Sequence, residues 1–383
     1  MLLHEAGLPS DTAPATFRLG TYRRLPPKHT LSAILPLAER YGVTRLADVT
    51  GLDRIGIPVF QAIRPMARSM TVSQGKGLTR TAARVSALME AIELHCAELV
   101  APDAFGLRQE GDSAADGVEG EIGWCRGTDL LSGRATRVPH AHVSMDYAQI
   151  GTPPAASSNG LASGNDRTEA IVSSLCELIE RDAQSRWLGR PAAIRQRAAI
   201  DPDTITDPVG LRLLRTLRAA GLGFRLWSFG EDHGVAAIAC AVYDLSSHSA
   251  LVLPPTMGAG AHLEPGIALA RAVTEAVQIR ATLIAGARDD LTERDYNAPQ
   301  LQRLRFLLES SGAAAPRQRW SSLRSRSTAC LARDRDLLLA AATNAGASQI
   351  ACIDLGEAGS PTAVVKILTP GFLGHGQRLA AAA

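Results

Sequence analysis

Apolar side chains recur at intervals of three and four residues in the segment SSNGLASGNDRTEAIVSSLCELIERDAQ, which covers residues 157–184. This spacing predicts an amphipathic helix from about Asp166 to Trp187. Asp166 stands three residues before Glu169, the arrangement of an N-cap residue and its capping-box partner, so the helix should begin there. The apolar positions that define its buried face are Ile171, Val172, Leu175, Leu178 and Ile179.

Two acidic residues share another stripe of this predicted helix. Glu177 and Glu180 stand three residues apart, which places their carboxylates on the same side. The pair recurs as Glu90 and Glu93 in the segment SQGKGLTRTAARVSALMEAIELH. A third copy, MGAGAHLEPGIALARAVTEAVQIR, has Glu275 at the first position and an amide at the second. The sequence therefore repeats one pattern three times.

The three copies begin near residues 73, 157 and 257, roughly a hundred residues apart. This period is far too long for a stacked solenoid repeat. It favours a single site assembled from three similar segments, each a glycine-rich loop followed by a helix. Such loops at helix N-termini would also present backbone N–H groups to anions.

The rest of the chain alternates between strand-like and helix-like patterns, which indicates an α/β fold. Apolar runs bounded by proline and glycine predict strands within residues 54–72, in a hairpin at 124–139 with its turn at Leu131–Gly133, and at 142–147, 223–229, 235–244, 347–356 and 363–371. Helical spacing predicts further helices at 30–41 with a break at Pro36, at 207–220, at 265–285 with Pro265 in the first position, and over much of 289–349.

No linker is long enough to separate independent domains. We expect a single domain over residues 20–375, a loose segment at 1–19 and a disordered tail at 376–383.

Composition limits the classes of function. The 383 residues are 46% apolar, enough for a sizeable core, and carry a net charge of only +2 with 4% aromatic residues, which argues against nucleic-acid binding. No signal peptide or membrane-spanning run is visible. Six scattered cysteines without a C-x-x-C pair are typical of buried thiols in a reducing compartment. We expect a cytoplasmic protein that binds neither nucleic acid nor membrane.

Convergence of the three helices would create an electrostatic problem. Unit charges about 7 Å apart repel by roughly 2 kcal/mol at an effective dielectric near 20. Four carboxylates would form about six such pairs, which rivals the 5–15 kcal/mol stability of a whole domain. Mg²⁺ would relieve this repulsion, because it takes oxygen ligands and bridges carboxylates to nucleotide phosphates. Nearby cations that could contact phosphate oxygens are Lys76, Arg181, Arg271 and Arg280.

Simpler interpretations compete with this one. A single E-x-x-E pair is most often a solvated helix face, and Glu169 could serve only as a capping residue. The SQGKGLT segment lacks the spacing of a P-loop, so that interpretation is rejected. His95, His262 and His375 fit structural and catalytic roles equally well. No Ser-His-Asp or Cys-His arrangement can be assembled.

At the three repeated segments the chain resembles the YcaO superfamily. SQGKGLTRTAARVSALMEAIE is similar to its first signature, SNGLASGNDRTEAIVSSLCELIERDA to its second and RAVTEAVQIR to its third. The similarity extends through GVTRLADVTGLDRIGIPVFQAIRP and WCRGTDLLSG, from about Gly20 to Gly371. The resemblance implies an α/β fold with mixed sheets, in which the three segments converge on a site for ATP and Mg²⁺.

The resemblance also assigns roles residue by residue. Mg²⁺ would be held by Glu90, Glu93, Glu177 and Glu180. The nucleotide would be surrounded by Arg23, Lys76, Ser86, Asn165, Glu169, Arg181, Arg271, Glu275 and Arg280. No general base is identified. Leu94 departs from the arginine that the family often has after the second glutamate, which affects one local contact.

The resemblance implies phosphorylation of a peptide backbone amide on oxygen while a nucleophile adds to its carbon. Azoline-forming members use a Cys, Ser or Thr side chain of the substrate and end in a proline-rich tail, whereas this chain ends VVKILTPGFLGHGQRLAAAA. We therefore favour thioamide formation with sulfide and a TfuA-like partner on a ribosomally made precursor peptide or protein. An azoline-forming cyclodehydratase with a separate delivery partner, and a non-catalytic nucleotide-binding partner, are the alternatives. A homodimer is also expected.

Overall fold

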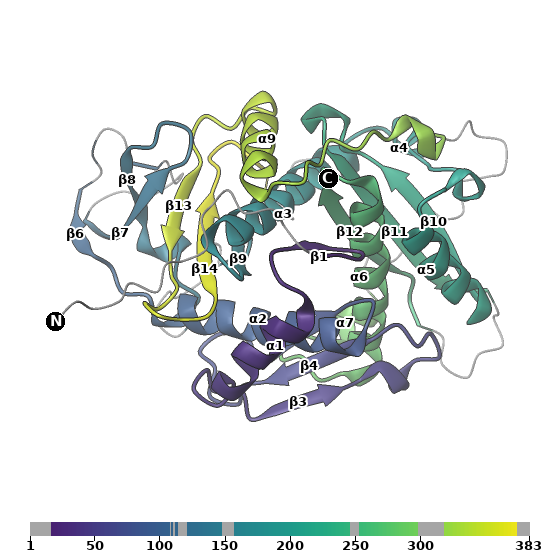
Figure 1. The fold of residues 1–383 in the computed structure, drawn as a ribbon, viewed down its shortest axis with the longest axis horizontal. Coiled ribbons are helices and arrows are strands. Elements are labelled where there is room, and N and C mark those ends of the chain that lie inside the picture. The colour runs from purple at the N-terminus through teal and green to yellow at the C-terminus, as the bar shows by residue number, and fades with distance from the viewer. Residues whose placement is uncertain are drawn as a thin grey trace.

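The computed structural model describes residues 17–107, 109, 112–113, 121–147, 157–245, 253–297 and 318–373. Three sheets surround three central helices, α2, α3 and α6 (Figure 1). Each central helix follows directly on a strand of a different sheet, so the three copies of the sequence repeat are three strand–helix units. The units are β5 Val72–Lys76 with α2 Arg80–Leu99, β9 Leu161–Gly164 with α3 Arg167–Leu188, and β12 Thr256–His262 with α6 Pro265–Ala285.

The sheet of the first unit has the order β3-β4-β5 and lies at the lower edge in Figure 1. Its other strands are β3 Arg45–Asp48 and β4 Val59–Ile63. Helix α2 packs on β4 and β5, and α1 Pro27–Ile34 packs against α2. Helix α1 ends in a short 3₁₀ turn, η1 Leu35–Leu37, which confirms the break predicted at Pro36.

The sheet of the second unit collects strands from distant parts of the chain. Its order is β6-β7-β13-β14-β9, with β8 paired to β7. Helix α3 packs on β9 and β14, and α9 Leu331–Asn344 covers α3. The remaining strands are β6 Ala104–Gly106, β7 Ile122–Asp129, β8 Ala135–Pro139, β13 Ala351–Asp354 and β14 Ala363–Leu368.

The sheet of the third unit has the order β10-β11-β12, with β11 in the middle and almost wholly buried. Helix α6 lies across β11 and β12. The other elements are β10 Leu222–Ser228, β11 Ala236–Asp244 and α5 Pro208–Ala219. Within the described ranges the ladder pairs between named strands are all antiparallel. The first and third sheets join consecutive strands, whereas the second joins strands from distant parts of the chain.

Smaller elements complete the described chain. A two-stranded hairpin, β1 Phe17–Arg18 and β2 Tyr22–Arg23, places residues 17 and 18 in the fold although they belong to the segment predicted to be loose. The remaining elements are α4 Ala192–Arg197, α7 Glu293–Asn297 and the 3₁₀ turns η2 Thr50–Leu52, η3 His140–His142, η4 Pro202–Thr204, η5 Glu231–His233 and η6 Trp320–Ser322.

Most glycines of the repeat lie in strands, where they allow close packing against a helix. This corrects the expectation that they form loops before the helices. Gly75, Gly164, Gly258 and Gly260 lie in strands β5, β9 and β12. A Cβ on Gly75 would lie 2.1 Å from the backbone oxygen of Ala83, and one on Gly164 or Gly258 would lie 2.4 or 2.3 Å from a helix backbone nitrogen. Each strand therefore presses directly on its helix, which only glycine permits.

Most predicted elements agree with the structure. Helix α6 has the predicted bounds with Pro265 at its first position, α5 begins after Asp207, and the hairpin turn contains Gly133 at φ +70°. The strand predicted at residues 142–147 is wrong, because residues 143–146 are buried in succession and follow η3 without forming a strand. The predicted tail and most of the N-terminal segment lie outside the described residues. No helix in the described ranges is long and apolar enough to cross a membrane.

Candidate functional site

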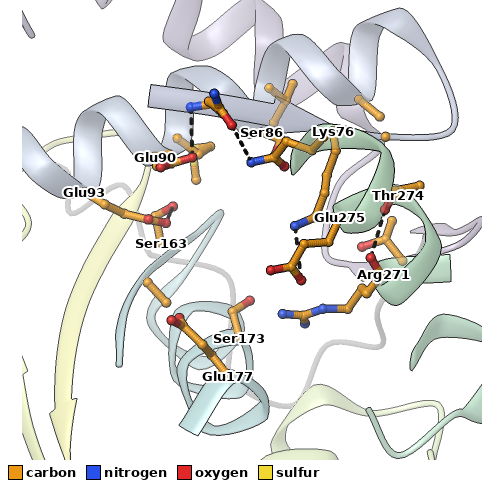
Figure 2. Close-up of a pocket in the computed structure, with 18 of the residues that line it drawn as sticks. Lys76, Ser86, Glu90, Glu93, Ser163, Ser173, Glu177, Arg271, Thr274 and Glu275 are labelled. Atoms are coloured by element: carbon orange, nitrogen blue, oxygen red, sulfur yellow. Dashed lines mark hydrogen bonds and ion pairs between the residues drawn. The ribbon is translucent and has the colours of Figure 1, made fainter. Parts of the chain in front are cut away.

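A cavity of about 790 Å³ lies where the three central helices meet. Its wall combines α2, α3 and α6 with the N-terminal hairpin and the chain leading to α1. Figure 2 shows carboxylates and cations from all three units projecting into it. The sequence-predicted residues that line the cavity are Arg23, Lys76, Ser86, Glu90, Glu93, Asn165, Glu169, Glu177, Glu180, Arg181, Arg271 and Glu275.

Arg280 is the predicted residue that the structure does not bring to the cavity. Its side chain is 2% exposed and is enclosed between two carboxylates. Its Nε donates to Asp53 (2.7 Å), and its Nη1 donates to Asp244 (2.8 Å). The guanidinium therefore ties α6 to β11 and to the segment before β4, and we leave it out of the nucleotide site.

Equivalent glutamates of two units are held in the same way. Glu90 accepts the backbone N–H of Gln74 at 3.0 Å, and Glu275 accepts that of Ala259 at 3.3 Å. In both cases the donor lies sixteen residues before the glutamate, in the strand that precedes the helix. The repeat in sequence thus produces a repeated strand-to-helix contact, which fixes each carboxylate at the cavity wall.

Four carboxylates of the first two units share a raised pKa. Burial raises the pKa of Glu93 to about 8, against a 2.5 Å hydrogen bond from Ser163 Oγ and with help from the charges of Glu90 and Glu177. Burial likewise raises the pKa of Glu177 to about 7, although Arg181 opposes it. The pKa of Glu90 and of Glu180 is raised mainly by burial as well. Without a cation, Glu93 therefore holds a proton at neutral pH and Glu177 holds one in part, and burial disfavours the ionised form of all four.

Glu275 differs from these four because cations lie beside it. Lys76 Nζ is 3.7 Å and Arg181 Nη2 is 3.8 Å from its carboxylate. Burial opposes its ionisation, but the two cations lower the pKa of Glu275 below its ordinary value. Arg271 points into the same part of the cavity in Figure 2 and forms no ion pair within the described chain. This side of the cavity can therefore receive an anion.

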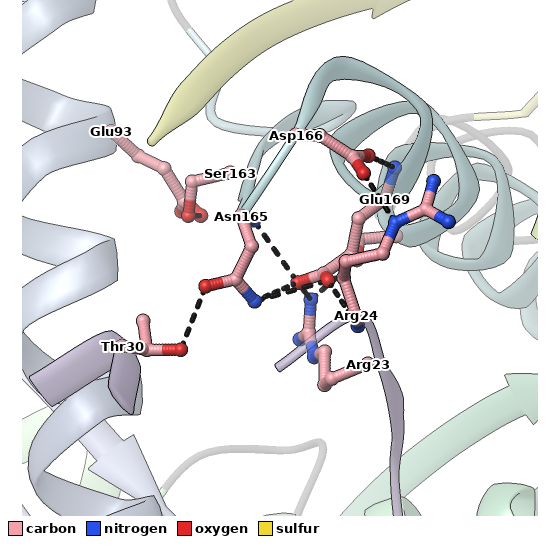
Figure 3. A network of polar contacts seen from close by, with 9 residues as sticks. Arg23, Arg24, Thr30, Glu93, Ser163, Asn165, Asp166 and Glu169 are labelled. Carbon is pink, nitrogen blue, oxygen red and sulfur yellow. Dashed lines mark hydrogen bonds and ion pairs between the residues drawn. The ribbon is translucent and has the colours of Figure 1, made fainter. Parts of the chain in front are cut away.

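Asp166 and Glu169 form a separate, fully paired network (Figure 3). Asp166 accepts the N–H of Glu169 at 2.8 Å, which confirms the predicted N-cap, and also pairs with Arg24 Nε at 2.5 Å. Glu169 accepts the N–H of Asn165 at 3.2 Å rather than that of Asp166, so the reciprocal bond of a capping box is replaced. Arg23 Nη1 also donates to Glu169, at 3.1 Å.

This network fastens the N-terminal segment to the start of α3. Glu169 is 2% exposed, and the backbone N–H of Arg24 donates to it at 2.7 Å. Arg23 Nη1 reaches Ser173 Oγ at 2.9 Å, and Thr30 donates to Asn165 Oδ1 at 2.7 Å. The oxygens of Glu169 are thus engaged within the protein. Its contribution to a nucleotide site would be to position Arg23 and Asn165.

Several residues of this site were not predicted. Ser163 lies inside the recognised second signature, so its spacing to the helix could have indicated it. Arg24, Thr30 and Gln74 carry no local signal, because their contacts join segments far apart in the chain. The sequence fits structural and catalytic roles of His262 equally well, and the structure places this residue in the cavity wall.

A family model described as a YcaO cyclodehydratase that binds ATP and Mg²⁺ matches residues 99–373. The chain belongs to the YcaO family. A curated relative from Rhizobium leguminosarum bv. trifolii, described as an uncharacterized protein in the tfuA 3′ region, is 33% identical over 91% of this chain and 88% of its own length. The resemblance seen in the sequence is thereby confirmed.

Solved structures agree with the fold. The structure of YcaO from Methanopyrus kandleri bound with AMPPCP and Mg²⁺ has a TM-score of 0.77 at 24% identity and covers 94% of both chains. A heterocyclase in complex with substrate and cofactor has a TM-score of 0.74 at 21% identity, covering 95% of this chain and 55% of the other. At these identities the likeness establishes the YcaO-type α/β fold and nothing finer.

ATP and Mg²⁺ are the cofactors of this family, and the donor set in the cavity fits them. Carboxylate oxygens of Glu90, Glu93, Glu177 and Glu180 are the ligands that Mg²⁺ prefers. Within the described ranges, no three His, Cys, Asp or Glu side chains come close enough to hold one ion by themselves. This agrees with the usual Mg²⁺ site, which takes one or two carboxylates and completes its shell with water and substrate phosphates. Bound Mg²⁺ would neutralise charge on the phosphates.

Proposed function

We propose that this YcaO-family enzyme activates a peptide backbone amide with ATP and converts it to a thioamide. The observation that carries the choice of product is the relative in the tfuA 3′ region, which matches over nine-tenths of this chain. A TfuA-like protein is accordingly the proposed partner, and a ribosomally made peptide or protein is the proposed substrate. We also propose that the enzyme acts as a homodimer.

The proposed reaction balances with hydrosulfide as the second substrate. The amide oxygen takes the γ-phosphoryl group of ATP as hydrosulfide adds to the amide carbon. Loss of the phosphorylated oxygen as phosphate then leaves a carbon–sulfur double bond. The products are the thioamide, ADP and phosphate. The chain contributes Lys76, Arg181 and Arg271 as cations for the phosphates and the four carboxylates as the metal-binding set.

Azoline formation is the second candidate, because the matching family model is described as a cyclodehydratase. Ring formation needs a Cys, Ser or Thr immediately after the activated carbonyl, held in attacking geometry. Sulfide would then play no part. A partner of the cyclodehydratase-delivery type in place of a TfuA-like one would favour this product.

Reconstitution separates the candidates. The protein, ATP, Mg²⁺, sulfide and a TfuA-like partner are incubated with a candidate peptide, and the product is examined by mass spectrometry. Exchange of one oxygen for sulfur supports thioamidation. Loss of one water without any need for sulfide would replace it with azoline formation. ATP binding without turnover of any peptide would instead favour a non-catalytic nucleotide-binding partner.

A further inference from the structure

His262 ends strand β12 and lies in the cavity wall, yet no role has been assigned to it. The side chain is 5% exposed, and its ring packs edge-on against Tyr22 at a centroid distance of 6.2 Å. Its Nδ1 accepts the backbone N–H of Glu264 at 2.9 Å, just before α6 begins. Nε2 has no hydrogen-bond partner within the described part of the chain. One ring nitrogen is therefore used by the fold, while the other has no partner in the described chain, in a residue that lines the cavity.

The hydrogen bond at Nδ1 decides which form of the ring is present. A nitrogen that accepts a hydrogen bond carries no proton, so the neutral imidazole must carry its proton on Nε2. Burial, together with the positive charges of Arg271, Arg23 and Arg18, lowers the pKa of His262 to about 3. The ring consequently stays neutral at physiological pH and can donate but not accept at Nε2.

We propose that the Nε2–H group of His262 donates a hydrogen bond to a phosphate oxygen of the bound nucleotide. Arg271 exerts the largest effect of any charged group on this ring, and Arg271 lacks an ion-pair partner within the described chain. Nearby carboxylates, Glu180 first, already act on Arg271 without forming an ion pair with it, so an anionic ligand could supply the direct partner, and the neutral N–H beside it would add a directed donor without a further charge. The inference rests on the nucleotide site of the proposed function and assigns His262 a binding role within it.

Two substitutions separate the two nitrogens of the ring. His262→Asn keeps an acceptor at the δ position for the Glu264 N–H but has no donor at the ε position. His262→Gln keeps an amide N–H at the ε position but loses the δ acceptor. A purely structural role would be rescued by asparagine, whereas a phosphate donor would be rescued by glutamine.

Calorimetric titration with Mg²⁺ and AMPPCP gives the decisive comparison. We expect His262→Asn to weaken binding about tenfold to a hundredfold, the usual worth of a hydrogen bond to a charged group, with a melting temperature close to that of the wild type. His262→Gln should bind within about threefold of the wild type and melt at a lower temperature. Equal losses in both variants, or wild-type binding by His262→Asn, would overturn the proposal.

Further controls locate the contact on the ligand. His142→Asn alters another histidine whose pKa burial lowers but which does not line the cavity, and it should leave binding unchanged. Adenosine should bind His262→Asn as well as it binds the wild type. An equal loss of affinity for adenosine would place the imidazole on the base or sugar and overturn the phosphate assignment.

In ¹⁵N-histidine-labelled protein, Mg²⁺ and AMPPCP should shift the Nε2–H proton of His262 to lower field. Failure of the wild type to bind AMPPCP would refute the nucleotide site itself, not this contact alone.

Discussion

Helix α3 carries two pairs of acidic residues with opposite surroundings. Asp166 and Glu169 in its first turn are met by Arg23, Arg24 and backbone N–H groups at hydrogen-bond distance. Glu177 and Glu180, two turns later, face the cavity, and the ion pair in the described chain nearest to either is the 3.8 Å contact of Arg181 with Glu180. The first pair is neutralised by the protein, whereas we propose that the second binds a cation supplied with the nucleotide.

The pKa values of the cavity pair agree with its incomplete pairing. Burial raises the pKa of Glu177 to about 7 and raises that of Glu180 as well, so the ligand-free protein disfavours their ionised forms. A buried carboxylate that fold stability alone required would be expected to have a full set of partners, as Glu169 has. Incomplete pairing at a cavity is therefore the better indicator of function on this helix.

Neutralising a cavity carboxylate should give the largest functional effect. In Glu177→Gln we expect ATP turnover to fall by about 100-fold or more, because a metal ligand is lost, and Glu180→Gln should behave alike. The melting temperature without ligand should stay equal or rise, since a source of repulsion is removed. Both quantities are measured on the same preparation, with a phosphate-release assay and by thermal unfolding.

The same substitution in the paired cluster provides the control. Glu169→Gln should lower the melting temperature, because Arg23 and the N–H groups of Arg24 and Asn165 lose a charged acceptor. Normal ATP hydrolysis by both Glu177→Gln and Glu180→Gln would show that the metal-site assignment is wrong. A rise in stability of Glu169→Gln would contradict the division of the helix into two clusters.

Arg280 tests whether a predicted ligand is structural. Removing it in Arg280→Met takes the guanidinium partner from Asp53, while Asp244 keeps Arg54, and breaking such a buried pair costs about 3–5 kcal/mol. The free energy of unfolding, measured in urea, should fall accordingly. Nucleotide affinity, measured below the unfolding transition, should change by less than about threefold. Collapse of that affinity at unchanged stability would return Arg280 to the nucleotide site.

Asp166→Ala should also act mainly on stability. An N-cap alone is worth about 1 kcal/mol, but Asp166 also pairs with the buried Arg24, and removing one partner of a buried ion pair raises the expected loss to about 3–5 kcal/mol. Asp166→Asn retains the cap without the charge and should separate the two contributions. An unchanged melting point with lost ATP binding would identify Asp166 as a ligand.

The sequence predicts elements whose signals are local. Pro265 at the start of α6, Asp207 before α5 and the N-cap of α3 depend only on neighbouring residues, and each is correct. The threefold repeat also allowed the convergence of the glutamates to be inferred, because similar segments that cannot stack as a solenoid are expected to share one site. The cavity confirms that convergence.

What the sequence could not predict depends on contacts between distant segments. Gly75 and Gly164 look like loop residues until their strands are seen pressed against helix backbones. Arg280 looks like a cavity cation because it follows Glu275 on the same helix, yet its partners Asp53 and Asp244 turn it elsewhere. In both cases contacts between distant segments decide where the residue lies, and the nucleotide role predicted for Arg280 stays a prediction that the Arg280→Met variant tests.

The pH dependence of the ligand-free protein tests the two cavity carboxyls directly. Burial raises the pKa of Glu93 to about 8 and that of Glu177 to about 7, whereas both return to their ordinary acidic values on unfolding. Between about pH 5 and pH 8 the folded state thus binds more protons than the unfolded state, so the free energy of unfolding should fall as pH rises and level off above about pH 8. Glu93→Gln and Glu177→Gln should each flatten this slope. Urea unfolding at several pH values, with and without Mg²⁺ and AMPPCP, measures the free energy of unfolding as a function of pH. Parallel curves for the wild type and both cavity variants would show that these carboxyls do not hold protons in the folded state.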